Sequence, residues 1–174
     1  MKLIRPFVLL ALAGLAVETV AHAILETPST PAGNYYKGVM KITHGCDGAA
    51  THTVRLLLPP EMQQSKPMPK PGWEVQPVRR KLVTPYDYHG KTMTDDVREL
   101  VWTGGNLGDE YYDEFVFSTR LAGEPGQTLY VKTIQECSEG RLNWTEIPTQ
   151  GQAAEELEYP APALKLIDGE SHRH

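Results

Sequence analysis

The residue with the clearest chemical potential is a histidine that follows an apolar N-terminal stretch. His22 stands after two basic residues, an apolar run and a group of small residues, which is the layout of a secretory signal peptide removed on export. Cleavage after Ala21 leaves His22 with a free α-amine, whereas cleavage after Ala23, the tidier small-x-small pattern, removes it. An α-amine has a pKa of about 8, so it loses its proton to a metal easily at neutral pH. The amine and the imidazole Nδ1 could then chelate one ion, and nitrogen ligands of this kind favour copper(II).

Two cysteines are the second feature with definite chemistry. Cys46 and Cys137 are the chain's two cysteines, and an even count in an exported chain predicts a disulfide, because the compartment outside the cytoplasm is oxidising. The alternative is a cysteine-based metal site. Neither cysteine has a second cysteine at the spacing found in zinc sites, so the disulfide is the favoured interpretation.

Charge and composition exclude several classes of partner and divide the chain. The net charge is −5 over 174 residues, which argues against nucleic acid and anionic membrane surfaces as partners. No segment after the leader is apolar enough to span a membrane, so the mature protein is expected to be soluble.

We expect a signal peptide over residues 1–21, one domain over residues 22–150 and a loosely ordered C-terminal extension over residues 151–174.

The elements that must position these residues are predicted to be strands. Short runs of β-branched and aromatic residues alternate with Gly, Pro and Asp clusters, and no segment shows a sustained helical period. Many short strands with regular turns predict an all-β fold, an antiparallel β-sandwich or barrel. The proline-rich stretch Pro59–Pro71 is expected to be a loop. The expected strands are His22–Glu26, Tyr35–Thr43, Thr51–Leu58, Trp73–Val78, Val97–Thr103, Tyr111–Arg120, Leu129–Gln135 and Leu142–Ile147.

Catalytic motifs are missing from the sequence. It contains no Gly-x-Ser-x-Gly elbow, no phosphate-binding glycine loop and no His-Glu-x-x-His pattern. Acidic residues are spread over expected turns and strand edges. No arrangement in the sequence pairs a nucleophile with a base. An enzyme is therefore not the expected reading, and metal binding is better supported.

The order of the motifs resembles the YcnI-like copper-binding domain family. The most specific elements are His44-Gly45-Cys46-Asp47-Gly48 and Pro71-Gly72-Trp73. The resemblance covers nearly all of the expected mature domain. Its segments are His22–Glu26, Ala32–Lys37, His44–Thr51, Lys70–Trp73, Val101–Gly105, Tyr111–Phe115, Gln135–Cys137 and Gly140–Trp144.

This resemblance implies a fold and a site. It implies export, a cupredoxin-like or immunoglobulin-like sandwich, and copper(II) bound through the N-terminal histidine, which His22 matches. Trp144 matches a tryptophan that flanks the site in the family, where it could exclude water from the metal; the alternative is that Trp144 only fills the core. Family members begin their mature chain at this histidine, which favours cleavage after Ala21.

The remaining ligand does not carry over cleanly. Many relatives have an acidic residue just after the second strand, where this chain has His44, and we suggest His44 as the substitute ligand. The alternative is that His44 only orients the turn before Cys46. Glu26 is a second candidate, but roughly 13 Å of extended strand separates it from His22, so direct coordination by Glu26 requires the strand to bend.

These observations together predict a periplasmic copper(II)-binding protein. It would buffer copper, or act as a chaperone that hands it to a membrane copper transporter or to another periplasmic copper protein. A shallow site with few ligands suits that role, because a partner can take the ion by ligand exchange. Two alternatives stay open: a redox enzyme that uses the same histidine brace on a polymer, and a metal-free module that binds an envelope protein.

Overall fold

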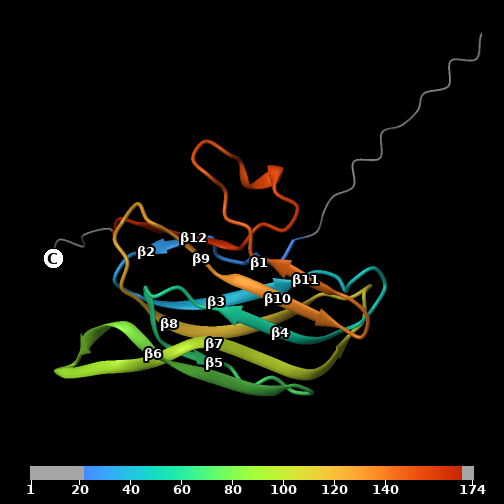
Figure 1. The fold of residues 1–174 in the computed structure, drawn as a ribbon, viewed down its shortest axis with the longest axis horizontal. Helices are drawn as coiled ribbons and strands as arrows, with labels where there is room; N and C mark the ends of the chain where they lie inside the picture. The colour runs from blue at the N-terminus through green and yellow to red at the C-terminus, as the bar shows by residue number, and fades with distance from the viewer. Residues whose placement is uncertain (1–21, 170–174) are drawn as a thin grey trace, which may run out of the picture.

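The structure, a computed structural model, describes residues 22–169, and the predicted signal peptide therefore lies outside the described residues. The chain folds into stacked antiparallel sheets (Figure 1), so the prediction of an all-β sandwich is confirmed. The elements are β1 (Ile24–Leu25), β2 (Ser29–Pro31), β3 (Tyr35–Ile42), β4 (Thr51–Leu57), β5 (Met62–Pro67), β6 (Glu74–Tyr88), β7 (Lys91–Leu107), β8 (Asp113–Leu121), β9 (Thr128–Tyr130), β10 (Lys132–Cys137), β11 (Arg141–Trp144), the 3₁₀ turn η1 (Ala154–Glu156) and β12 (Ala163–Ile167).

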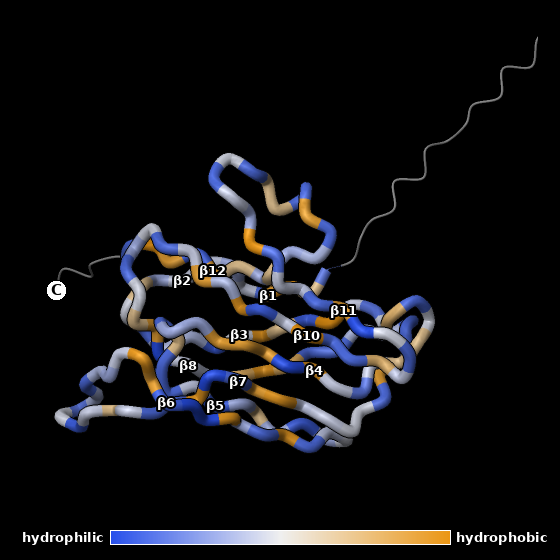
Figure 2. Tube along the Cα trace, viewed as in Figure 1, coloured by the Kyte–Doolittle hydropathy of each residue, from blue (hydrophilic) through white to orange (hydrophobic). Residues whose placement is uncertain are grey.

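Two larger sheets and one small sheet make up the sandwich. The strand orders are β1-β3-β8-β5, β11-β10-β4-β7-β6 and β2-β12-β9. Neighbouring strands are antiparallel except β12 and β2, which run parallel. Along β4, β7 and β3, residues of opposite hydropathy follow one another in Figure 2, as expected where one face of each strand packs on the core.

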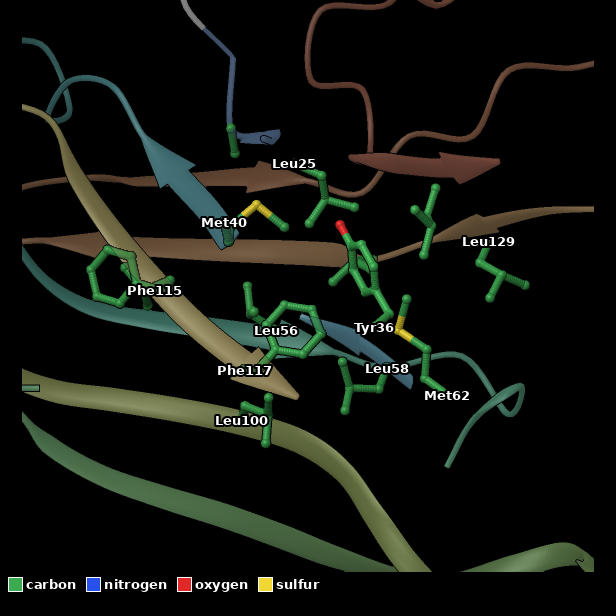
Figure 3. Packing of buried hydrophobic residues seen from close by; sticks show 14 of the residues in the cluster. Leu25, Tyr36, Met40, Leu56, Leu58, Met62, Leu100, Phe115, Phe117 and Leu129 are labelled. Atoms are coloured by element: carbon green, nitrogen blue, oxygen red, sulfur yellow. The ribbon is translucent and has the colours of Figure 1, made fainter. Parts of the chain in front are cut away.

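The core lies between the two larger sheets. Met40 of β3, Leu56 of β4 and Phe115 of β8 are fully buried, and Figure 3 shows these side chains pointing into one shared interior. The pattern follows from the two-residue period of a strand, which directs alternate side chains to the same face. The resulting frame carries the start of β1 and the ends of β3 and β11, where His22, His44 and Trp144 lie.

The prediction of a loop over Pro59–Pro71 is wrong for its central part. Residues 62–67 form β5, which pairs with β8. Met62 and Ser65 are buried, and Pro67 ends the strand at the edge of its sheet. Prolines are tolerated there because an edge strand has one side without ladder partners.

The prediction of a loosely ordered extension over residues 151–174 is wrong for residues 163–167. They form β12, which pairs with β2 and β9, and Leu164 and Leu166 are fully buried. The alternation of these leucines with Ala163, Lys165 and Ile167 is a strand signal. The last residues of the extension, 170–174, lie outside the described part of the chain.

Two further features complete the fold. Strands β6 and β7 are longer than predicted and form a hairpin that projects beyond the sheet, at the lower left of Figure 1. Within residues 22–169, no helix is long and apolar enough to cross a membrane.

Candidate metal centre

Trp144 is the point at which the predicted ligands meet. The Trp144 indole is 1% exposed. The His22 imidazole lies 5.8 Å from its ring centre at an interplanar angle of 75°, and the His44 imidazole lies 6.0 Å away at 82°. Both imidazoles thus pack edge-on against one indole, and the structure brings His22, His44 and Trp144 together although the sequence separates them widely.

The register between β1 and β3 explains why His22 lies beside His44. Ile24 pairs with Lys41 and Leu25 with Met40, so the antiparallel register, continued by two residues, brings His22 opposite Thr43. The Thr43 hydroxyl donates a hydrogen bond to the His22 carbonyl at 3.4 Å. His44 follows Thr43 directly, and the two histidines therefore meet at the same end of the sheet.

The hydrogen bond of the His44 ring determines which of its nitrogens can bind a metal. Nδ1 lies 2.6 Å from the Gly45 carbonyl oxygen, and a carbonyl oxygen can only accept a hydrogen bond. Nδ1 therefore carries the proton in the neutral ring, and the lone pair resides on Nε2. A histidine oriented by a backbone carbonyl in this way is typical of metal-ligating histidines.

The segment that carries His44 is held by contacts from distant parts of the chain. The backbone N–H of Gly45 donates to the Asp109 carboxylate at 2.8 Å, and a Cβ atom at position 45 would collide with the Ala49 carbonyl oxygen. Cys46 forms a disulfide with Cys137, with 6.1 Å between the two Cα atoms, so the predicted disulfide is confirmed. Glycine at position 45 is therefore required by close packing.

A tight turn closes this segment. Cys46 and Ala49 exchange backbone hydrogen bonds of 3.0 and 2.9 Å, and the two residues between them, Asp47 and Gly48, have φ of 49° and 89°. Positive φ at both central positions is the geometry that an Asp-Gly pair favours. The His-Gly-Cys-Asp-Gly motif thus combines an oriented imidazole, a close backbone contact, a crosslink and a turn.

Gln135 is a site residue that the sequence analysis did not single out. Its side chain is 1% exposed and contacts both Trp144 and the His44 backbone. A signal was present in the sequence, since Gln135 is a polar residue at an inward position of a strand, in step with Val131 and Thr133. A buried polar side chain at such a position requires hydrogen-bond partners.

A tyrosine with nearby carboxylates also packs on the indole. The Tyr159 ring packs on Trp144 with centroids 5.5 Å apart. The pKa of Tyr159 is raised above its ordinary value, chiefly by a hydrogen bond to the Glu158 carboxylate, with further contributions from the negative charges of Asp47 and Glu146.

The Glu26 carboxylate forms an ion pair with a lysine. Its Oε1 is 3.0 Å from the Lys41 ammonium, and both side chains belong to the outer surface of the β1-β3-β8-β5 sheet. The ring contacts of Trp144 involve the two histidines and Tyr159, and Glu26 is not among them.

The donor set determines which ion could bind. Among residues 22–169, no three His, Cys, Asp or Glu side chains gather into a group that could hold a metal. In the predicted site the imidazoles of His22 and His44 would supply two nitrogens, and the His22 α-amine would supply a third if the chain is cleaved after Ala21. Two imidazoles and one amine form a nitrogen donor set that fits copper(II).

Comparisons with known proteins bear on the family and the fold. A sequence profile described as "Domain of unknown function (DUF1775)" matches residues 22–166, a segment that begins at His22 and ends within β12. No curated protein matches the chain. A crystal structure of an uncharacterized protein from Nocardia farcinica, with an immunoglobulin-like fold, is similar with a TM-score of 0.65 and 20% identity, over 84% of this chain and 98% of that one. At this identity the likeness concerns the fold alone.

Proposed function

The chain belongs to DUF1775, the family of YcnI-like domains, and from this premise we propose that it binds copper(II) outside the cytoplasm. The ligands are the α-amine and imidazole of His22 and the Nε2 atom of His44. One observation carries the proposal: two histidines, one before β1 and one after β3, pack against the same buried indole. The disulfide supports a location in an oxidising compartment such as the periplasm.

The surroundings of the histidines suit an ion that must be taken up and released. Trp144 forms an apolar wall on one side and limits the approach of water there. His22 and His44 are both partly exposed, so another protein can reach them. Copper is then the cargo of a buffer or chaperone, and the partner is a membrane copper transporter or another periplasmic copper protein, which receives the ion by ligand exchange.

The first experiment determines whether the amine exists. The full chain is expressed with export, and the intact mass of the secreted protein is measured. We expect a mature chain that begins at His22. A chain that begins at Ile24 lacks both the amine and its imidazole, and that result would refute the proposal.

The second experiment measures copper binding by the mature protein. Titration with copper(II) against a competing chelator is expected to give one tight site. One glycine added before His22 should weaken binding by orders of magnitude, because the chelate between amine and Nδ1 is lost. His44→Ala should weaken it and remove one nitrogen from the electron paramagnetic resonance spectrum.

His52→Ala is the matched control for both variants. His52 is exposed on β4, with its Nδ1 2.9 Å from the Thr53 hydroxyl. Its replacement by alanine should leave copper binding unchanged. Stoichiometric binding that is indifferent to both the added glycine and the loss of His44 would contradict the proposed ligands. No uptake of copper(II) by the mature protein would contradict the function itself.

A further inference from the structure

We propose that Gln135 is the positioning residue of the copper site: its single carboxamide aligns the Trp144 wall with the His44 ligand. The inference rests on the proposed function, and it assigns a task to a residue that neither ligates metal nor reaches solvent. Its basis is a set of three hydrogen bonds in the interior of the sandwich.

The carboxamide of Gln135 uses both of its polar atoms. Its Oε1 accepts a hydrogen bond from the Trp144 indole Nε1 at 3.2 Å. Its Nε2 donates to the His44 carbonyl at 2.6 Å and to the Thr51 hydroxyl at 2.8 Å. The indole N–H can only donate and the His44 carbonyl can only accept, so the orientation of the amide is fixed by its partners.

The disulfide alone does not fix His44. Gln135 and Cys137 are two residues apart on β10 and point to the same face. Cys137 holds Cys46, whereas Gln135 holds the residue two positions earlier. Gly45 lies between these two anchors, and glycine is the residue with the greatest backbone freedom. The hydrogen bond from Gln135 to the His44 carbonyl and the hydrogen bond from the Gly45 N–H to Asp109 therefore restrain the peptide unit between His44 and Gly45 at both of its polar atoms.

The same side chain determines where the indole lies. Trp144 pairs with Thr133 across β10 and β11, and its N–H reaches diagonally to Gln135. One planar amide forms hydrogen bonds with both the Trp144 indole and the His44 backbone. The distance between the indole and the His44 residue therefore depends on one rigid group. Glutamate at this position would keep the acceptor for Trp144 but would place an oxygen against the His44 carbonyl oxygen. Methionine has a side chain of similar length and would remove all three hydrogen bonds.

The test compares Gln135→Met and Gln135→Glu with the wild-type protein, each with its disulfide formed. The matched control is Gln63→Glu, since Gln63 is also buried on a strand but bonds Arg120 at 2.6 Å, near the opposite end of β3. Copper(II) affinity should fall roughly 10- to 100-fold in both Gln135 variants. The copper hyperfine splitting should also change, and the control should match the wild type.

A measurement on metal-free protein separates positioning from general damage. The indole N–H resonance of Trp144 and the imidazole resonances of His44 should shift in Gln135→Met. The indole N–H resonance of Trp102, which donates to the Met68 carbonyl, should stay in place. If Gln135→Met does not fold, Gln135→Glu supplies the same readouts with the side chain's size preserved.

The possible outcomes are distinct. Wild-type affinity and an unchanged spectrum in a folded Gln135 variant would overturn the positioning role while leaving the copper site intact. A wild-type protein that binds no copper(II) would overturn the proposed function, and the role of Gln135 in a copper site would fall with it. Weaker binding together with shifts confined to Trp144 and His44 would support the inference.

Discussion

Removal of the Cys46–Cys137 disulfide is the sharpest test of how the fold holds the His44 segment. The crosslink joins residues 91 positions apart, and the chain-entropy model assigns a loop of this size about 4–5 kcal/mol of stabilisation. A domain of this class has a free energy of unfolding of about 5–15 kcal/mol. The double variant C46A/C137A should therefore lose a large fraction of its stability.

The variant should still fold, because backbone pairing around both cysteines does not depend on sulfur. Strand β10 pairs with β4 from Lys132 to Glu136, and the turn after Cys46 has its own backbone hydrogen bonds. A loss of this size corresponds to a fall in Tm of roughly 8–20 °C for a domain of this length. The denaturant m value should rise, because the unfolded chain without the crosslink exposes more surface.

Urea unfolding of oxidised wild type and C46A/C137A measures the effect, with reduced wild type as the control. The reduced protein and the variant should unfold at similar urea concentrations. A loss below about 1 kcal/mol in the variant would refute the loop-entropy reasoning. A large loss in C46A/C137A without a matching loss in reduced wild type would assign the effect to packing of the substituted side chains.

Three further predictions concern the frame around the site. Leu164→Ala, in β12, should cost about 2–5 kcal/mol in urea unfolding, and a change within error would contradict the inclusion of β12 in the core. Asp96→Ala should lower the free energy of unfolding by about 3–5 kcal/mol, because it leaves the largely buried Arg98 guanidinium without its carboxylate partner. A loss no larger than that expected for a solvent-exposed ion pair would contradict the conclusion that this ion pair is buried. Burial and then the charge of Glu26 raise the pKa of Tyr36 from 10.0 to about 12. The neutral phenol is thus favoured by folding, and this stability is fully present below pH 10 and lost as the pH rises from 10 through 12. Tyr36→Phe should remove about 2 kcal/mol of pH dependence between pH 9 and 11.5, measured by unfolding over that range. An equal pH dependence in Tyr36→Phe would contradict the assignment to Tyr36.

Most of the fold could be predicted because strand signals are local. The alternation from Glu114 to Ser118 can be recognised within one short stretch. The disulfide follows from a simple count of two cysteines. The errors arose where composition and pattern disagreed. Prolines around β5 concealed an edge strand, and the Ala, Glu and Pro content before β12 concealed five alternating residues that complete a sheet.

The site was less accessible to sequence reasoning. His22, His44 and Trp144 were named through a family resemblance, and no spacing in the chain predicts that they meet. Their meeting depends on the register of β1 against β3 and of β10 against β11, which long-range pairing determines. Gln135 could have been found as a polar residue in an inward position, but its partners could not.

The two histidines of the site are restrained to different degrees. The His44 segment is tied by the Gln135 hydrogen bond, the Asp109 carboxylate and the disulfide, which reach it from three separate parts of the chain. His22 precedes the two-residue strand β1 at the edge of its sheet, and short edge elements open at lower free energy than the core. We therefore expect the contact of His22 with Trp144 to open at a lower free energy than the contacts that hold His44. In the copper site proposed above, this asymmetry would provide one fixed ligand that defines the site and one that leaves first when the ion is released.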